Sequence, residues 1–455
     1  MADLLIRNAR SVATLDADRR ELTGGWVSVT NGFVEAVGTS TDPVPAANEV
    51  VDAAECLVTP GLVNAHHHIY QNLTRAWPHM TSQPLFGWLQ RLYPLWRGLD
   101  EESIYASTWV GLAELALGGC TTSTDHLYVH PNGAGDLLAA EIAAARSIGL
   151  RFHPTRGSMS LSEKDGGLPP DDVVSDDDSI LAASEEAVHR HHDRSYGSMV
   201  RVALAPCSPF SVTESLMVRS AELAERLDVR LHTHFAENRE DDDFSLARFG
   251  CRPMDYLERT GWCTERTWVA HCVMPNPDEV RRLGAAKIGV AHCPSSNLIL
   301  ASGIAPVVPM RHAGVKVGLG VDGSSSADSA SLWLEARQAM LLAKLRDGAG
   351  AGTARMALEI ATVGGAGCLG REGEIGVLTP GAVGDVTVWK LDGPLFAGAI
   401  ADPIEAWLRC GPIGAWHTVV QGRFVVRDGH IVDDAALADA LVRHRRESAR
   451  IQGGA

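Results

Sequence analysis

The order of apolar and polar residues divides the chain into two kinds of segment. Residues 4–16 (LLIRNARSVATLD) and 24–38 (GGWVSVTNGFVEAVG) alternate in the period-two pattern of β-strands, and Asn31-Gly32 is a strong hairpin signal. Residues 384–392 and 417–432 repeat this pattern near the other end. We therefore expect residues 1–57 and 376–432 to pair into one small β-sandwich domain, with the long middle inserted between its halves.

The middle of the chain alternates short β-branched runs with Ala-, Leu- and Glu-rich helical stretches. Such alternation indicates parallel strands joined by helical crossovers, and eight units in about 300 residues fit an α/β fold of the (β/α)₈ TIM-barrel type over residues 58–375. An open doubly wound sheet is the alternative, but the GxGxxG loop typical of it is missing. Residues 433–455 read as a C-terminal helix and tail. The expected barrel strands are 62–68, 121–126, 151–157, 201–206, 230–235, 267–272, 288–294 and 315–322.

Composition narrows the class of function. The 455 residues carry a net charge of −16, which argues against nucleic-acid and anionic-membrane partners because both require basic surface. No apolar run approaches the roughly 20 residues of a membrane span, and the N-terminus lacks the pattern of a signal peptide. Nine cysteines without CxxC pairs suit a reducing compartment. We expect a cytoplasmic protein.

Three consecutive histidines in VTPGLVNAHHH mark the first candidate for chemistry. Because alternate side chains of a strand share a face, His66 and His68 point one way and His67 the other. Two imidazoles on one face suit a single metal ion. Taken by itself, this motif is explained equally well by buried, hydrogen-bonded histidines. The residues at the other strand ends decide between a metal site and this structural role.

Further histidines and carboxylates close three more of the expected strands. HTHFAE supplies His234 and Glu237, TWVAHC supplies His271, and GLGVDG supplies Asp322. Active sites of parallel barrels lie at the carboxyl ends of the strands. Because histidines and carboxylates recur at the carboxyl ends of four expected strands, the sequence predicts one catalytic centre there.

Together the pieces PGLVNAHHH, HTHFAE, VAHC and GVDG resemble the amidohydrolase superfamily over nearly the whole chain. The resemblance implies a barrel beside a β-sandwich and a divalent metal at the active site. Relatives with two metals carry a lysine at the end of the fourth strand. The corresponding stretch here, RVALAPCSPF, has none, which implies a single metal ion, with Zn²⁺ expected and Fe²⁺ the alternative.

The same resemblance implies a role for each residue. Asp322 is expected both to bind the metal and to be the base that deprotonates the water on the metal. His271 would hydrogen-bond that water or the developing alkoxide, and Glu237 would carry a proton to the substrate. The implied metal ligands are His66, His68, His234 and Asp322.

The expected substrate is a flat heterocycle, because the stretch NAHHHIYQNLTRAWP resembles the family branch that deaminates 8-oxoguanine. Where guanine deaminases carry an arginine after the fourth strand, this chain has Cys207. Trp88, Tyr93 and Trp96 could form an apolar lid together with Trp77, although for any single one of these aromatics ordinary helix packing is the favoured interpretation. The proposed substrate contacts are Gln71, Trp77, Arg156 and Cys207.

Other functions on the same scaffold stay open. They include deamination of isocytosine, guanine, triazines or adenosyl-homocysteine-type nucleosides, and dechlorination of triazines. Some relatives have lost their metal ligands and act as structural proteins, but every expected ligand is present here. The family also implies a homo-oligomer as one possible assembly.

Overall fold

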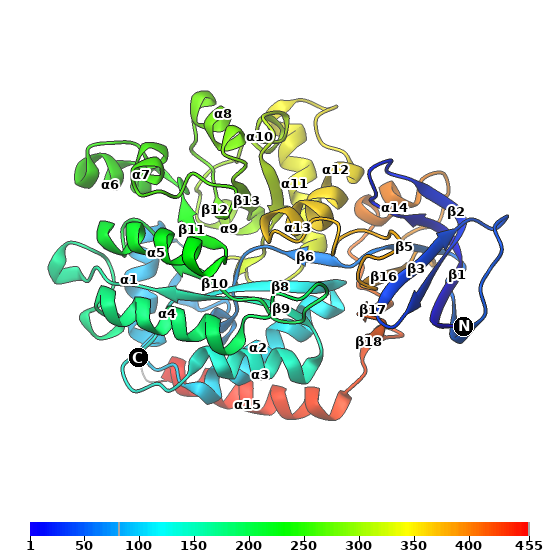
Figure 1. The fold of residues 1–455 in the computed structure, drawn as a ribbon, viewed down its shortest axis with the longest axis horizontal. Coiled ribbons are helices and arrows are strands. Elements are labelled where there is room, and N and C mark those ends of the chain that lie inside the picture. The colour runs from blue at the N-terminus through cyan, green and yellow to red at the C-terminus, as the bar shows by residue number, and fades with distance from the viewer. Residues whose placement is uncertain (81, 454–455) are drawn as a thin grey trace.

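The computed structural model describes residues 1–80 and 82–453, and its centre is a closed barrel of eight parallel strands (Figure 1). The fold therefore confirms the expected (β/α)₈ class. In barrel order the strands are β10 (Ala203–Pro206), β11 (Leu231–Phe235), β12 (Thr267–His271), β13 (Gly289–His292), β14 (Lys316–Leu319), β6 (Leu62–Asn64), β8 (Cys120–Leu127) and β9 (Arg151–Ser158).

Helices surround the barrel, and most of them follow a strand as a crossover (Figure 1). They are α1 (Leu85–Trp96), α2 (Glu101–Leu117), α3 (Leu137–Ile148), α4 (Asp177–His191), α5 (Glu214–Leu227), α6 (Arg239–Phe249), α7 (Pro253–Arg259), α8 (Pro277–Ala285), α9 (Pro294–Ile299), α10 (Val307–His312), α11 (Leu332–Asp347), α12 (Ala354–Glu359) and α13 (Gly365–Cys368). A short 3₁₀ helix, η1 (Ile69–Thr74), follows the histidine motif directly.

The first and last barrel strands are shorter than the sequence predicts. The chain leaves the barrel ladder after β6 and after β14, then re-pairs just above it as β7 (His67–His68) and β15 (Asp322–Gly323). Asp322 stands opposite His67 in this two-residue ladder. The break brings the histidine motif and the aspartate together at the carboxyl end of the barrel.

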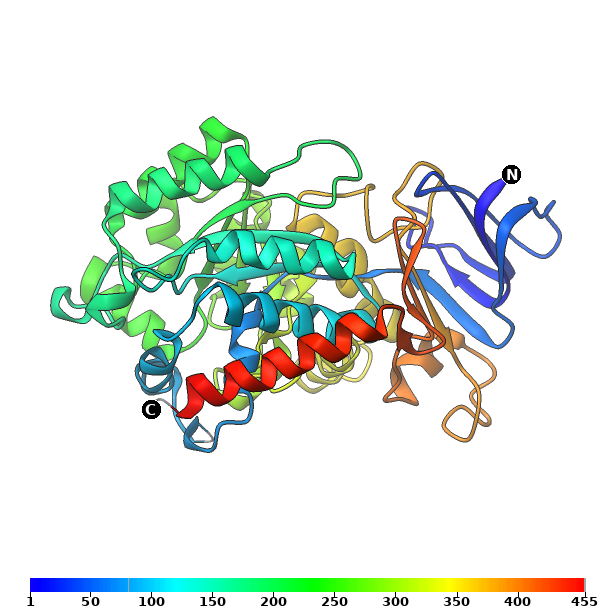
Figure 2. The same ribbon diagram turned by 90° about the horizontal axis from the view of Figure 1, so that it is seen from below.

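Strands from both ends of the chain pair into one continuous sheet beside the barrel (Figures 1 and 2). Within the described residues this sheet has nine strands, and β5 pairs in parallel with β1 and antiparallel with β16, so the two terminal segments are hydrogen-bonded to each other. Its strands are β1 (Ala2–Ala13), β2 (Glu21–Thr30), β3 (Phe33–Gly38), β4 (Ala47–Asp52), β5 (Cys56–Pro60), β16 (Val386–Lys390), β17 (His417–Val420), β18 (Arg423–Arg427) and β19 (His430–Ile431).

Two helices accompany this sheet in sequence. Helix α14 (Pro403–Arg409) lies between β16 and β17, and α15 (Asp434–Gly453) runs back along the barrel after β19 (Figure 2).

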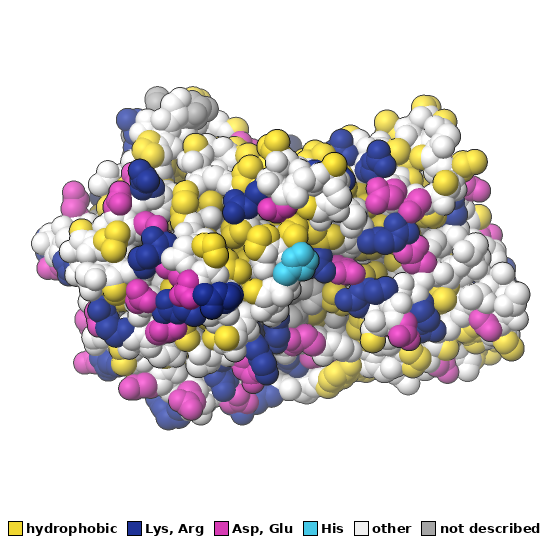
Figure 3. All heavy atoms as spheres, turned by 90° about the horizontal axis from the view of Figure 1, so that it is seen from above, with side chains coloured by type: hydrophobic (Ala, Val, Ile, Leu, Met, Phe, Trp, Pro, Cys, Tyr) yellow, Lys and Arg dark blue, Asp and Glu magenta, His cyan; other side chains and the backbone are white. Residues whose placement is uncertain are grey.

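The division of the chain into domains at residues 57, 375 and 432 stays a prediction. No helix in the described part of the chain has both the length and the apolar content that crossing a bilayer requires. The face in Figure 3 carries basic and acidic side chains next to each other.

Candidate active site

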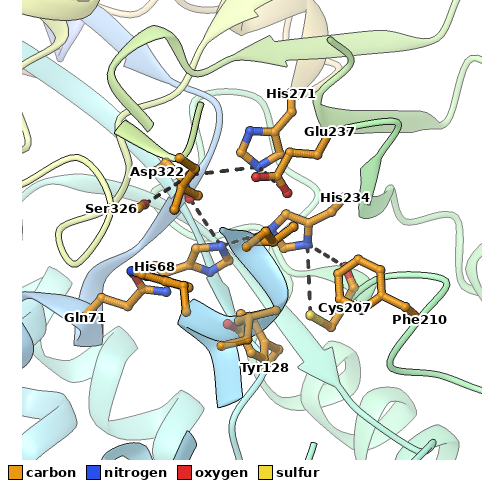
Figure 4. A pocket seen from close by; sticks show the side chains of 14 residues that line it. His68, Gln71, Tyr128, Cys207, Phe210, His234, Glu237, His271, Asp322 and Ser326 are labelled. Atoms are coloured by element: carbon orange, nitrogen blue, oxygen red, sulfur yellow. Dashed lines mark hydrogen bonds and ion pairs between the residues drawn. The ribbon is translucent and has the colours of Figure 1, made fainter. Parts of the chain in front are cut away.

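Three histidines and one aspartate converge at the carboxyl end of the barrel. His68 Nε2 lies 3.0 Å from His234 Nε2, and Asp322 Oδ1 lies 3.3 Å from His66 Nε2 and 3.4 Å from His68 Nε2. All four residues are buried. Strand ends that are distant in sequence therefore place four potential ligand atoms around one point, and Figure 4 shows His68, His234 and Asp322 turned toward one another.

The second nitrogen of each histidine ring fixes its orientation. His68 Nδ1 donates to the carbonyl of His126 at 2.8 Å, and His234 Nδ1 donates to the carbonyl of Cys207 at 2.6 Å. His232 donates through Nδ1 to a backbone carbonyl, so its Nε2 accepts the Nδ1 proton of His66 at 2.8 Å. Each inward-facing Nε2 is consequently left without a proton, as metal ligation requires.

This donor set fits a divalent metal ion. Burial lowers the pKa of His66, His68 and His234, the last to about 3, so the rings are neutral. Two bare nitrogen lone pairs 3.0 Å apart repel each other unless a cation lies between them. Four ligands held about 2.1 Å from a tetrahedral zinc ion are about 3.4 Å from one another, close to the separations of 3.0–3.4 Å here.

Two further groups face the same point from the neighbouring strands. His271 Nε2 lies 3.7 Å from Glu237 Oε2 and 3.9 Å from Asp322 Oδ2. Burial disfavours the charged imidazole, but the two carboxylates outweigh it and raise the pKa of His271. Burial raises the pKa of Glu237 to about 7. Burial would also raise the pKa of Asp322, yet the surrounding imidazoles hold it well below its usual value. The site thus contains an imidazole with a raised pKa, a carboxylate with a lowered pKa and a carboxyl that exchanges its proton near neutral pH.

The backbone at two of these residues is in the left-handed region. His271 has φ 69° and Asp322 has φ 57°, values that residues other than glycine seldom adopt. His271 is the last residue of β12, and Asp322 is the first residue of β15, where the chain has left the barrel ladder after β14. Non-glycine residues held in this way concentrate at functional sites.

A pocket opens onto the point where these ligand atoms converge, and its empty space, open mouth included, is about 370 Å³. Gln71 and Cys207, both proposed from the sequence, line it, and so does Trp88 of the expected lid. Tyr93 and Trp96 are buried in the apolar layer behind. The full lining is His68, Gln71, Leu85, Trp88, Leu89, Tyr128, Cys207, Phe210, His234, Glu237, His271, Leu300, Asp322 and Ser326.

The structure places two sequence-based candidates away from this pocket. Arg156 pairs with Leu127 across the sheet, one position beyond the inward-facing His126, so its side chain points outward and lines a separate cavity beside α3 and α4. Trp77 packs, partly buried, against the apolar cluster of the lid and is not among the residues that line the pocket. Neither position supports contact with a ligand at the convergence point.

Several residues that face the centre were missed. His126, at the end of β8, has a ring nitrogen within 4.8 Å of the ligand atoms of His66, His68 and His234. The stretch TTSTDH showed it in the sequence, but a single histidine carried no spacing signal. Tyr128 and Phe210 line the pocket from loops after β8 and β10, and no motif marked them. Asn297 Oδ1 lies 3.0 Å from His271 Nδ1 and thereby orients that ring.

Comparisons with known proteins agree on the family. The amidohydrolase family model matches residues 57–425. An 8-oxoguanine deaminase from Pseudomonas aeruginosa is 47% identical over 454 residues, which cover 100% of both chains. A hydroxydechloroatrazine ethylaminohydrolase from Pseudomonas sp. (strain ADP) is 36% identical over 401 residues, 86% of this chain and 83% of that one. The crystal structure of an atrazine chlorohydrolase from Arthrobacter aurescens TC1 complexed with zinc covers 97% of this chain and 100% of its own, with a TM-score of 0.92 and 31% identity.

Proposed function

Because this chain belongs to the amidohydrolase family and is a hydrolase of C–N bonds, we propose that it deaminates 8-oxoguanine to urate and ammonia. The main support for this proposal is that three unprotonated histidine nitrogens and Asp322 converge beside Glu237 and His271. The 47% identity to an 8-oxoguanine deaminase over the full length supports the choice of substrate.

One divalent metal ion is part of this proposal. His66, His68, His234 and Asp322 would hold it, since their ligand atoms are the ones separated by 3.0–3.4 Å. Zinc suits three imidazoles and a carboxylate, and iron(II) is the alternative. When bound, such an ion lowers the pKa of water to about 7 and so supplies hydroxide at neutral pH.

The side chains around this point divide the proton transfers among them. Asp322, an ionised carboxylate, accepts a proton from the attacking water and returns it to the departing ammonia. Glu237, with its pKa near 7, donates a proton to a ring nitrogen of the substrate and makes the adjacent carbon electrophilic. It regains a proton from the hydroxyl group of the tetrahedral intermediate as the carbonyl forms and ammonia leaves. His271, whose pKa the two carboxylates raise, donates a hydrogen bond that stabilises the negative charge developing on the attacking oxygen.

The pocket walls suit a flat base with polar edges. Trp88, Leu89 and Phe210 offer apolar surface for the faces of the ring. The Gln71 amide both donates and accepts, so it can pair with a purine edge. Cys207 stands where guanine deaminases carry an arginine, which leaves that side of the pocket with more room and without a charge.

Gly323 supports Gln71, because a Cβ there would lie 1.7 Å from Gln71 Oε1. We expect Gly323→Ala to displace the amide and raise KM for 8-oxoguanine roughly tenfold, with kcat little changed. Gln71→Ala should have the same effect, and the double variant should be no worse than either single one. Steady-state kinetics of the three variants check this. A normal KM in Gln71→Ala would remove Gln71 from the substrate contacts.

A panel of substrates tests the proposed function. Zinc-loaded protein is assayed for ammonia release from 8-oxoguanine, guanine, isocytosine and hydroxytriazines, and for chloride release from chlorotriazines. We expect the highest kcat/KM with 8-oxoguanine. A higher kcat/KM with another amino heterocycle would overturn the assignment of 8-oxoguanine as the substrate but leave the deaminase activity standing. Release of chloride without ammonia would overturn both assignments.

A further inference from the structure

The last helix of the chain lies along the barrel and reaches the segment that carries the pocket floor. In Figure 2, α15 runs past α2, and its C-terminal end approaches the segment between the first barrel strand and α1. The catalytic roles proposed above use no residue of this helix. Its contacts with η1, α1 and α2 nevertheless join parts of the chain more than 300 residues apart.

Three side chains of α15 bind the short helix η1. Ser448 Oγ and Gln452 Nε2 both donate to the carbonyl of Leu73, at 2.7 and 2.6 Å. His444 Nε2 lies 2.9 Å from Asn72 Oδ1, whose amide nitrogen donates to a carbonyl of α2. Carbonyls at the end of so short a helix have few partners of their own, so these bonds fix its position.

η1 connects the metal-site motif to the substrate pocket. It begins immediately after His68 and contains Gln71, which lines the pocket. On its other side, Ser325 Oγ donates to the carbonyl of Gln71 at 2.9 Å. η1 is therefore held between α15 and the loop that follows β15, which contains Ser325. A shift of α15 would consequently move Gln71.

The C-terminal end of α15 also holds the turn between α2 and α1, the helix that covers the pocket. Arg450 Nη1 donates to the carbonyl of Gly98 at 2.8 Å, and its Nη2 lies 3.0 Å from Asp100. Glu447, itself buried, accepts from Arg450 at 2.6 Å and keeps the guanidinium in place. Ile451 is buried in the apolar cluster that includes Trp88. One helix thus ties the floor of the pocket to its cover.

We propose that α15 is a positioning element for substrate binding: through Ser448, Gln452 and Arg450 it sets the distance between η1 and α1. The KM test below rests on the proposed function, and the exchange test does not. The proton-transfer groups Glu237, His271 and Asp322 come from other strand ends, and no hydrogen bond or ion pair in the described part of the chain joins them to α15. Loosening this helix should therefore weaken substrate binding and leave the chemical step intact.

The test compares Ser448→Ala/Gln452→Ala with wild type. We expect KM for 8-oxoguanine to rise roughly five- to tenfold, the effect of losing one or two hydrogen bonds, while kcat changes less than about twofold. Hydrogen–deuterium exchange of the peptide spanning residues 69–75 should be at least about tenfold faster. The single variant Ser448→Thr, with Gln452 unchanged, keeps both hydrogen-bond donors. It should show the wild-type KM and the wild-type exchange rate.

Arg443→Ala is the matched control on the same helix. Arg443 pairs with Asp439 and Glu102 and lies over the Tyr105 ring, so it contacts α2 and not η1. We expect normal KM and normal exchange of residues 69–75 in this variant. Unchanged exchange in the double alanine variant would overturn the proposal whatever the activity. Equal increases of KM in the control and the double variant would reduce α15 to general stabilisation and also overturn it.

Discussion

Replacing Glu237 by glutamine is expected to lower kcat for deamination about 10³-fold, or about 4 kcal/mol of transition-state stabilisation. Glutamine keeps the size and polarity of the side chain but has no proton to transfer at neutral pH. Glu237 is buried in the pocket wall 3.7 Å from His271, so no bulk water can take over its role directly. Ammonia release under saturating substrate measures the effect.

Two observations separate this loss from a damaged site. The variant should bind metal as wild type does, because Glu237 is outside the set of four converging ligands. Asp243→Asn, an exposed carboxylate on α6, should retain full activity. A Glu237→Gln variant with more than about a tenth of wild-type kcat would exclude Glu237 as the proton carrier.

Removing one metal ligand should have an even larger effect. His234→Ala takes away a nitrogen that lies 3.0 Å from that of His68 and leaves three ligands. We expect less than about a tenth of an equivalent of metal per chain after dialysis, and a loss of at least about 10⁴-fold in kcat/KM. Elemental analysis and the ammonia assay check both values on the same preparation.

His126→Ala provides the contrast, because His126 also faces the centre but its Nε2 is hydrogen-bonded to the carbonyl of Ala205 at 3.0 Å. It should retain its metal. Metal loss in His126→Ala together with retention in His234→Ala would mean that the ligand set is a different one. His232→Ala should fall between the two, with metal affinity lower by roughly 10- to 100-fold, since His232 only orients His66.

The sequence predicted those parts of the structure that depend on periodicity and on motifs. Alternating strand and helix patterns indicated the barrel, and the strand patterns at the two ends indicated the extra sheet. Histidines two residues apart and single acids at strand ends identified the four converging residues. Each of these signals is local, so a few neighbouring residues suffice to express it.

The remainder depends on how distant segments meet. Arg156 was a candidate because it stands near a strand end, but its neighbour across the sheet shows that it faces the helices. Tyr128 and Phe210 lie in loops whose direction no periodicity defines. The pairing of β7 with β15 needs segments about 255 residues apart to meet, and the left-handed backbone of Asp322 is part of that junction.

A zinc titration of metal-free protein, with ammonia release from 8-oxoguanine as the readout, tests the central claim most directly. A mononuclear deaminase should gain activity in proportion to added zinc, reach its plateau at one equivalent per chain, and form one urate for each ammonia. A plateau at two equivalents would contradict the four-ligand site. Ammonia release that is independent of metal, or no ammonia from any amino heterocycle with zinc bound, would contradict the proposed function itself.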